Sequence, residues 1–559
     1  MCGIFFISNN PINPTICENF EKGSGRGPEF STIEQIDNNI FGFHRLAING
    51  LDEISNQPFL IDDCVLICNG EIYNYRELAQ YMGITLKTNS DCEIIIYLYR
   101  KYGIDYCLQL LDGVFAFVLY DKRAKKIIAS RDPYGVRPMF YYLCNSGNIY
   151  IASEVKMIYN LVKNKSSIIN FKPGRYLLMD LHNNIYTINS YNQFTFRNIN
   201  YNTDLNKIIE LNKNVYTDII TYITNSVKKR VINTTERPIA CLLSGGLDSS
   251  LIAALVNRYY LKYTGKPVET YSIGLKDSPD ILAARQVAKH INSIHTEVVV
   301  TEQEFLDAIP EVIYTIESYD TTTVRASVGN YLIAKYISKY SNAKVIFNGD
   351  GADELMGGYL YMKMAPDEMS FDMETRRLLN DIYIYDVTRS DKSISSNGLE
   401  ARTPFLDRQW VEFYLTISRN LRYSTTCEHC EKYLIRKAFS VYDSNLLPES
   451  ILWRQKEAFS DGVSKHEKSW STIIKEYLEK KIDTDEEFNK TIKQTQLEYY
   501  HFDRSNNKLE TVEQTYYRLI YNEYYKHTDH LIPYYWMPSF VEASDASART
   551  LDIYNKENK

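Results

Sequence analysis

The sequence IACLLSGGLDSSLIAALV occupies residues 239–256. Its first five residues are apolar and predict a short buried strand, and its last six predict a helix. Between them, residues 244–250 combine two glycines with three serines and an aspartate. A strand, a glycine turn and a helix N-terminus form a typical anion site, because free backbone amides and the helix dipole converge there. The segment therefore predicts a phosphate-binding loop at the edge of an α/β sheet.

The sequence pattern changes near residue 210. Beyond this point, helical segments alternate with short strands rich in Val, Ile and Ala, which predicts a parallel sheet covered by helices. The first ~185 residues instead alternate short apolar runs with turns. Residues 64–68 and 113–120 predict buried strands there, and residues 90–102 predict a helix. Residues 187–209 are polar and rich in Asn, which favours a linker between two domains.

The composition limits the classes of function. The chain has 559 residues, 44% of them hydrophobic, and a formal net charge of −7. It has no dense Lys/Arg run, which argues against nucleic-acid binding, and no apolar run long enough to cross a membrane. From the position of Cys2 next to Met1 we expect no secretory leader. The ten cysteines are scattered rather than patterned, so we expect reduced thiols and a cytoplasmic location.

The amino terminus indicates a second kind of chemistry. It reads Met1-Cys2-Gly3. Removal of Met1 would leave Cys2 with a thiol and a free α-amine, which titrates at about 8 and can serve as the base for its own thiol. Gly3 leaves room for a substrate close to the backbone. These features indicate an N-terminal cysteine nucleophile.

Four further segments support that interpretation. They are Arg26-Gly27-Pro28-Glu29, His44-Arg45-Leu46-Ala47, Cys68-Asn69-Gly70-Glu71-Ile72-Tyr73-Asn74 and Ser90-Asp91-Cys92-Glu93. In order with Cys2, they resemble the class II glutamine amidotransferases, an N-terminal-nucleophile hydrolase family. The resemblance implies that Arg45 clamps the glutamine α-carboxylate and that Asn69 and Gly70 form the oxyanion hole. It implies that Asp91 receives the substrate ammonium. Other residues implied in this pocket are Leu46, Ala47, Ile48, Asn49 and Glu71.

The heptad Ser244-Gly245-Gly246-Leu247-Asp248-Ser249-Ser250 resembles the pyrophosphate-binding loop of the ATP pyrophosphatases. It lacks the spacing of a Walker loop, so the resemblance implies adenylation of an acid and release of pyrophosphate. With the glutaminase motifs, the chain resembles the glutamine-hydrolysing asparagine synthetases. Further motifs of this resemblance lie at residues 273–275, 278–280, 320–327, 398–407, 453–462, 536–538 and 545–551.

The resemblance implies a two-domain fold. An αββα N-terminal-nucleophile hydrolase sandwich is expected over residues 2–186, followed by the linker at 187–209. A parallel-sheet α/β domain of the ATP-pyrophosphatase type is expected over residues 210–559. A homodimer is expected from the resemblance alone.

The resemblance also implies the reaction. Cys2 forms a γ-glutamyl thioester with L-glutamine and releases ammonia, while ATP adenylates the β-carboxylate of L-aspartate. Ammonia crosses the protein interior and attacks the adenylate, and asparagine, AMP and pyrophosphate leave. The implied ATP-binding residues are Leu243, Ser244, Gly245, Gly246, Asp248, Ser249, Ser250, Ile273, Asn348, Gly349 and Lys456. Thr322, Arg325 and Asp353 are implied at the aspartate or intermediate site, and Mg²⁺ is expected on Asp248 and Asp353.

One position departs from the family pattern. The family reads Ser-Gly-Glu-Gly-Ser-Asp-Glu where this chain reads Asn348-Gly349-Asp350-Gly351-Ala352-Asp353-Glu354. Asp350 stands where a glutamate is expected to take a proton from ammonia and to help form the adenylate. Aspartate is one methylene shorter, and a misplacement near 1 Å can cost on the order of 100-fold in rate. We expect Asp350 to act as the base at reduced efficiency.

Three alternatives stay open at this point. The first is an amidotransferase of the same architecture that acts on another carboxylic acid. The second is a β-lactam-forming synthetase, although those relatives lack the working N-terminal cysteine. The third is a weakened sensor that binds glutamine or ATP without turnover, and its support is Asp350.

Overall fold

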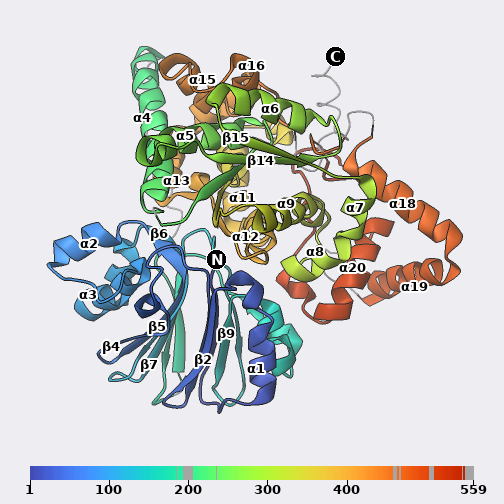
Figure 1. Ribbon diagram of the computed structural model, residues 1–559. Helices are drawn as coiled ribbons and strands as arrows, with labels where there is room; N and C mark the ends of the chain where they lie inside the picture. The colour runs from blue at the N-terminus through green and yellow to red at the C-terminus, as the bar shows by residue number, and fades with distance from the viewer. Residues whose placement is uncertain are drawn as a thin grey trace.

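The computed structural model describes residues 1–183, 185–192, 205–234, 236–457, 462–464, 468–502, 509–543 and 545–547. Figure 1 shows two halves: the amino-terminal strands lie below, and the helix-rich remainder of the chain lies above them. The amino terminus lies at the junction between the two halves.

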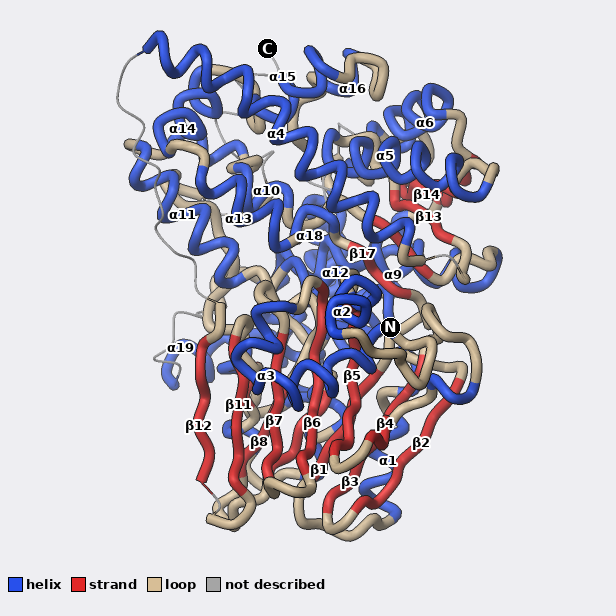
Figure 2. The backbone as a smooth tube through the Cα atoms, turned by 90° about the vertical axis from the view of Figure 1, so that its left-hand side faces the viewer, coloured by secondary structure: helices blue, strands red, loops and turns tan. Residues whose placement is uncertain are grey.

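Two six-stranded antiparallel sheets form the amino-terminal half. The first has the order β10 (Ile169–Asn170), β8 (Phe140–Leu143), β9 (Ile149–Ala152), β1 (Gly3–Ile7), β3 (Asn39–Arg45), β2 (Phe30–Ile36). The second has the order β12 (Ile185–Ser190), β11 (Arg175–Asp180), β7 (Lys126–Arg131), β6 (Gly113–Asp121), β5 (Cys64–Ile72), β4 (Phe59–Ile61). Figure 2 shows their strands upright and side by side.

Alternation of side chains along the strands builds the layers. One core contains Phe6 and Phe43 of the first sheet together with Ile67 and Val118 of the second, so it lies between the two sheets. The outer face of the second sheet packs on α2 (Tyr75–Met82) and α3 (Ile94–Leu110). The outer face of the first packs on α1 (Pro14–Glu21). The predicted αββα sandwich is confirmed.

The second half is built on five parallel strands. Their order is β15 (Ile294–Val299), β14 (Glu269–Gly274), β13 (Ile239–Leu242), β16 (Val345–Phe347), β17 (Glu400–Arg402). Since β14 lies on one side of β13 and β16 on the other, the order reverses at β13. In open α/β sheets, ligands bind outside the carboxyl ends of the strands at such a switch point. The predicted parallel α/β domain is confirmed.

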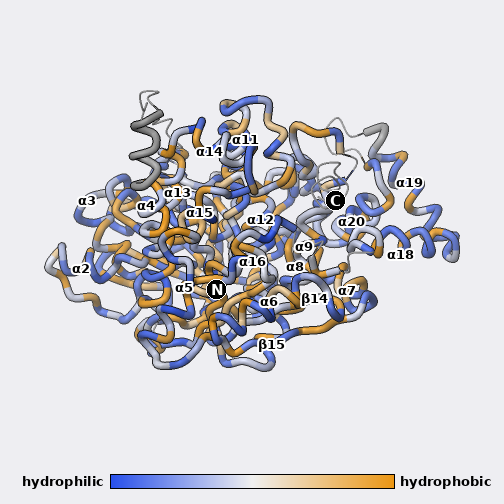
Figure 3. Tube along the Cα trace, turned by 90° about the horizontal axis from the view of Figure 1, so that it is seen from above, coloured by the Kyte–Doolittle hydropathy of each residue, from blue (hydrophilic) through white to orange (hydrophobic). Residues whose placement is uncertain are grey.

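Helices surround this sheet. They include α4 (Leu205–Ile232), α5 (Leu247–Thr264), α6 (Pro279–Ile291), α7 (Glu302–Asp307), α8 (Ile309–Ile316), α9 (Thr321–Tyr340), α10 (Ala352–Met356), α11 (Glu368–Asp381), α12 (Asp386–Ser395), α13 (Arg408–Thr416), α14 (Arg419–Glu428), α15 (Tyr433–Tyr442), α16 (Glu449–Leu452), α18 (Trp470–Thr484), α19 (Glu486–Phe502) and α20 (Val512–Tyr525). Seen from above, α18 and α19 project from the side opposite α2 and α3 (Figure 3). Among the described helices, none combines the length and apolar character that a membrane span requires.

The junction between the halves differs in one detail from the expected linker. Strand β12 pairs with β11 as far as Ser190, so the sheet continues past the expected end of the first domain at residue 186. The isolated sequence hides this because β12 is a largely exposed edge strand that lies beside the Asn-rich segment. Helix α4 begins at Leu205, and residues 193–204 of the expected linker lie outside the described residues.

Candidate active sites

Cys2 lies at the start of β1. The pairing of Gly3 with His44 brings it beside the end of β3, and its thiol donates a weak hydrogen bond to the Leu46 carbonyl at 3.7 Å. The Arg26 Nε donates to the Cys2 carbonyl oxygen at 2.9 Å. Burial raises the pKa of the Cys2 thiol to about 11 in this chain, which retains Met1. The thiol is therefore neutral in this state near neutral pH.

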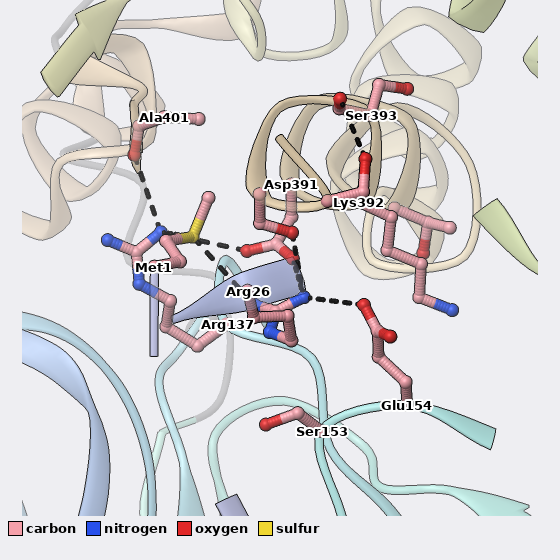
Figure 4. Close-up of polar contacts among 12 residues, drawn as sticks. Met1, Arg26, Arg137, Ser153, Glu154, Asp391, Lys392, Ser393 and Ala401 are labelled. Atoms are coloured by element: carbon pink, nitrogen blue, oxygen red, sulfur yellow. Dashed lines mark hydrogen bonds and ion pairs between the residues drawn. The ribbon is translucent and has the colours of Figure 1, made fainter. Parts of the chain in front are cut away.

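Met1 is wholly buried at the junction. Its amino group donates to the Leu399 carbonyl at 2.8 Å, and burial lowers the pKa of that amine to about 5. Its thioether lies between Arg137 and Arg26 (Figure 4). While Met1 is present, Cys2 has no free α-amine to activate its thiol. The terminal amine belongs to Met1, one residue away, and it is hydrogen-bonded to Leu399 in the other half of the molecule.

Residues 45–49 comprise the end of β3 and the loop after it, and they were predicted to line the glutamine pocket. The Arg45 guanidinium donates to the Asp52 carbonyl at 2.9 Å, to Asn56 Oδ1 at 2.6 Å and to the Gly50 carbonyl. The Ala47 amide donates to Glu29 at 2.7 Å, and Asn49 Nδ2 donates to Glu71 Oε2 at 2.8 Å. The predicted pocket residues Leu46, Ala47 and Ile48 are all buried here. The structure thus places this loop between Cys2 and β5.

Asn69 and Gly70 lie next to each other on β5. Among the described residues, no hydrogen-bond partner reaches the buried Asn69 Nδ2. A buried donor left without a partner is costly, so its presence indicates a role in which the donor is used. A Cβ at Gly70 would lie 2.7 Å from the Val114 carbonyl oxygen, so only glycine fits there. The Asn69 donor suits the predicted oxyanion hole, whereas the requirement for glycine at position 70 comes from close packing of β5 on β6.

Two buried carboxylates complete this site. Asp91 Oδ2 accepts a hydrogen bond from the Ile72 amide at 2.5 Å, and burial raises its pKa to about 6. Burial also raises the pKa of Glu71 well above its usual range, although Arg402 Nη2 lies 3.2 Å from Glu71 Oε1. Arg402 belongs to β17, so a side chain from the second half reaches the glutamine-type pocket.

The second site is a cavity at the carboxyl ends of β13 and β16. Among the predicted residues it is lined by Leu243, Ser244, Gly246, Asp248, Ser249, Ile273, Thr322, Asn348, Gly349, Asp350, Asp353 and Lys456. Gly245 supports the turn instead: its φ is +74°, and a Cβ there would lie 2.5 Å from the backbone of Ala283. A Cβ at Gly349 would lie 2.9 Å from the Ser249 amide nitrogen, so the two loops pack directly together.

The loop after β13 has the expected anion-binding geometry. Helix α5 starts at Leu247 with Gly246 as its N-cap, and no side chain caps its first amides. The Ser244 and Ser249 hydroxyls lie 3.0 Å apart and hold the turn. Within the described structure, the buried Ser250 Oγ has no hydrogen-bond partner. Free amides at a helix N-terminus attract phosphate through both hydrogen bonding and the helix dipole.

Two lysines and two carboxylates face each other in this cavity. Lys432 Nζ lies 2.5 Å from Asp248 Oδ2 and 2.6 Å from Asp353 Oδ1, and Lys456 Nζ lies 2.6 Å from Asp353 Oδ2. Burial would raise the pKa of Asp353, but the two lysines outweigh it and hold that pKa below its usual value. Burial prevails at Asp248, whose pKa is raised.

Asp248 and Asp353 are also the residues expected to bind Mg²⁺, and their geometry fits that ion. Asp248 and Asp353 converge on one ammonium group, so a single cation of suitable size could contact both. The buried Asp248 Oδ1 has no hydrogen-bond partner among the described residues. Carboxylate oxygens are the preferred ligands of Mg²⁺. These two residues therefore fit the ion expected there.

Asp350 is fixed by two neighbours. Arg389 Nη2 donates to its Oδ1 at 3.0 Å, and Asn348 Nδ2 donates to its Oδ2 at 2.8 Å. Arg389 lies on α12 and also pairs with Asp386 at 3.0 Å. The shorter carboxylate thus points to α12, and Asn348 occupies space that a serine side chain would leave open.

Helix α9 carries two predicted residues that behave differently. The buried Thr322 Oγ1 faces the cavity and has no hydrogen-bond partner in the described structure. Arg325 does not line the cavity within that part of the chain. Its guanidinium pairs instead with Glu513 at 2.6 Å and with Asp545 at 2.8 Å. Its role at the intermediate stays a prediction.

Several cavity residues were not identified from the sequence. Asp280 lies in the motif at 278–280 and Arg454 in the motif at 453–462, and their 3.0 Å ion pair could have been sought from those motifs. Lys432, Asp386 and Arg389 belong to no quoted motif and reach the cavity through tertiary folding. Residues 458–461 and 548–551 of the quoted motifs lie outside the described residues.

Comparisons with known proteins agree with this division into two sites. A glutamine amidotransferase domain model matches residues 1–197, and an asparagine synthase model matches residues 219–370 and 363–531. The glutamine-hydrolysing asparagine synthetase of Gallus gallus is 39% identical over 583 residues, which cover 99% of each chain. That of Homo sapiens is 39% identical over 580 residues, which cover 100% of each chain. A solved glutamine phosphoribosylpyrophosphate amidotransferase from B. subtilis, with ADP and GMP, has a TM-score of 0.29 and 16% identity, covering 49% of this chain and 67% of that chain.

Proposed function

The chain belongs to the glutamine-hydrolysing asparagine synthetase family, and we propose that its two sites divide that reaction as follows. Family membership establishes ATP-dependent synthesis of asparagine with glutamine as the nitrogen donor. Glutamine is hydrolysed at Cys2, and the cavity after β13 and β16 activates aspartate. We propose the expected domain limits of 2–186 and 210–559, with 187–209 between them, except that strand β12 extends the first domain to Ser190.

At the first site, the Cys2 thiolate attacks the glutamine side-chain amide. Loss of Met1 gives Cys2 a free α-amine, which takes the thiol proton and later delivers it to the departing ammonia. The tetrahedral oxyanion is stabilised by Asn69 Nδ2 and the Gly70 amide. Arg45 holds the α-carboxylate of glutamine, and Asp91 holds its ammonium group. Water then cleaves the γ-glutamyl thioester to glutamate.

At the second site, the β-carboxylate of aspartate attacks the α-phosphorus of ATP. A P–O bond to the β-phosphate breaks, so pyrophosphate leaves and β-aspartyl-AMP remains. The amides that begin α5 and the Lys456 ammonium contact the phosphates, and Thr322 faces the aspartate. Mg²⁺ held by Asp248 and Asp353 would neutralise phosphate charge. We propose that Arg325 acts at the intermediate once its ion pairs are exchanged.

Ammonia completes the synthesis. Its nitrogen attacks the acyl carbon of β-aspartyl-AMP, the C–O bond to AMP breaks, and Asp350 accepts the released proton. The orientation of Asp350 is set by Asn348 and Arg389, so its shorter reach is fixed rather than adjustable. Products are asparagine and AMP.

The observation that carries this assignment is the cavity at the switch point, where the phosphate loop, both lysines and Asp350 converge. The decisive experiment incubates the protein with glutamine, aspartate and Mg-ATP and assays asparagine, AMP and pyrophosphate. A Cys2→Ala variant should make asparagine only when ammonium is added. Glutamate without asparagine or AMP would mean that another acid is the substrate or that Asp350 has disabled synthesis.

Two further proposals concern the protein as a whole. All ten cysteines are free, which supports a reducing compartment such as the cytoplasm. A homodimer is proposed from the family resemblance, and light scattering of the purified protein tests it.

A further inference from the structure

Helix α12 is a buried helix made almost entirely of polar residues. Its sequence is DVTRSDKSIS, in which Val387 and Ile394 are the apolar members. Asp391 and Lys392 are exposed by only 2% and 1%. Charged residues are seldom buried to this extent unless they are paired. The buried polar groups of this helix therefore need partners in the surrounding structure.

One side of α12 holds the synthetase base. Arg389 Nη2 donates to Asp350 Oδ1 at 3.0 Å, and the next residue, Ser390, accepts a hydrogen bond from Asn348 Nδ2 at 2.6 Å. Both partners belong to the loop that follows β16. The position of this part of α12 thus sets the position of the Asp350 carboxylate.

The opposite side of α12 holds the backbone of the glutaminase nucleophile. Asp391 Oδ2 accepts a hydrogen bond from Arg26 Nη1 at 2.8 Å, and Ser395 Oγ accepts one from the same nitrogen at 3.0 Å. Arg26 in turn donates through Nε to the Cys2 carbonyl at 2.9 Å. Figure 4 shows Asp391 and Arg26 meeting beside Met1, with Glu154 on the far side of the guanidinium.

Charge pairs are a poor way to stabilise such an interface. Desolvation of buried ions often cancels their attraction, and apolar residues of similar volume would hold the two halves at least as well. What buried pairs can supply is a unique alignment, because a shift that breaks one leaves an unpaired buried charge. The pairs on α12 therefore fix how Cys2 and Asp350 lie relative to each other.

We propose that Asp391 is a positioning residue that couples the two active sites through α12. This rests on the proposed roles of Cys2 and Asp350. Glutamine bound at Cys2 displaces Arg26, Arg26 shifts α12 through Asp391, and Arg389 carries the shift to Asp350. A packed helix moves as one body, so small displacements at one face appear at the other. Coupling between binding sites is reciprocal, so ligands in the ATP cavity alter glutamine binding equally.

The test measures the KM for glutamine hydrolysis with and without aspartate plus the Mg²⁺ complex of α,β-methylene-ATP, which fills the cavity without turnover. The wild type should show a change in KM of about 5-fold or more. Asp391→Asn should remove that change in KM, and its kcat for glutamine hydrolysis is recorded separately because Asp391 also holds Arg26, which contacts the Cys2 carbonyl. The matched control is Asp372→Asn on α11, which disturbs an equally buried pair with Arg422 but lines neither site. It should keep the wild-type change.

Two results would overturn the proposal: a wild-type KM that does not respond to the cavity ligands, or an Asp391→Asn variant that responds fully. If Asp391→Asn does not fold, as judged by circular dichroism, Ser395→Ala replaces it and should reduce the response. Wild-type asparagine synthesis from ammonium is measured in parallel. Its absence would refute the proposed function and this inference together, whereas synthesis without coupling would refute this inference alone.

Discussion

In the glutamine pocket burial raises the pKa of Asp91 to about 6, whereas in the ATP cavity Lys432 and Lys456 overcome burial and hold the pKa of Asp353 below its usual value. The two aspartates are both placed to meet a cation. Under the proposed function, Asp91 receives the ammonium group of glutamine, so the substrate supplies its counter-charge. Asp353 is paired with lysines that we propose contact phosphate, so the protein supplies its counter-charge before ATP binds.

The difference shows how each substrate's charge shapes its site. Under the proposed function, a zwitterionic substrate meets fixed charges of both signs, and the glutamine pocket adds a neutral donor, Asn69 Nδ2, which has no hydrogen-bond partner among the described residues. A polyanionic substrate needs cations, and uncompensated buried cations would destabilise the fold. The ATP cavity therefore stores its lysines in ion pairs with Asp248 and Asp353.

Removal of Lys456, one of the two lysines held in these ion pairs, should have the largest effect. Lys456→Ala should lower asparagine synthesis from ammonium by about 10³-fold, because the charge that meets the phosphates is lost. Glutamine hydrolysis without ATP or aspartate should remain near wild type, as followed by glutamate release. Equal loss of both activities would show that Lys456 supports the fold rather than the cavity.

Removal of the neutral donor should affect the other site. Asn69→Ala should lower glutamine hydrolysis by about 10²-fold through kcat, since the donor acts on charge that develops in the transition state. Synthesis from added ammonium serves as the internal control and should be unchanged. A rise in KM with an unchanged kcat would instead assign Asn69 to ground-state binding.

Lengthening the side chain of Asp350 tests whether its reach limits synthesis in the cavity. Asp350→Glu should raise synthesis from ammonium by about 10-fold, because the added methylene restores reach toward the acyl carbon. Arg389 remains able to hold the longer carboxylate. Steady-state rates at saturating aspartate and ATP measure the effect, with glutaminase activity as the control. An unchanged synthesis rate would exclude reach as the limitation at Asp350.

The last comparison concerns pH, where the expected effect near neutral pH is the smallest of the four. Asp91 must be ionised to hold the substrate ammonium, and its pKa is about 6. The kcat/KM for glutamine should therefore fall as the pH drops through about 6, by about 10-fold for each unit below. Asp91→Asn should lower kcat/KM at neutral pH and remove this inflection. An inflection that survives in the variant would belong to another group.

The sequence predicted what is local. The strand, turn and helix at 239–256, the strands at 64–68 and 113–120 and the alternation after residue 210 all appear in the structure, because each is fixed by short-range pattern. The residues missed were those brought in by tertiary contact. Lys432 contacts Asp248 although the two residues are 184 positions apart in the sequence, and no motif around Lys432 indicates this pairing.

Arg325 shows the converse case: its motif was recognised, but its tertiary contacts were not. Its motif lies on α9, whose N-terminus reaches the cavity. Its partners Glu513 and Asp545 lie 188 and 220 residues away, so no local pattern indicated that they would hold the guanidinium. The end of β12 was placed too early for a related reason, since residues 187–190 join the sheet through long-range pairing with β11.

The ion pair between Arg325 and Asp545 links the carboxyl-terminal segment to a buried residue. Loss of that segment would therefore change the environment of Arg325. The Asp545 side chain is 27% exposed, whereas that of Arg325 is 5% exposed. An exopeptidase that trimmed the chain past Asp545 would strip a surface residue yet leave a core guanidinium with Glu513 as its remaining carboxylate. If Arg325 acts at the intermediate as proposed, such trimming should alter asparagine synthesis and leave glutamine hydrolysis intact.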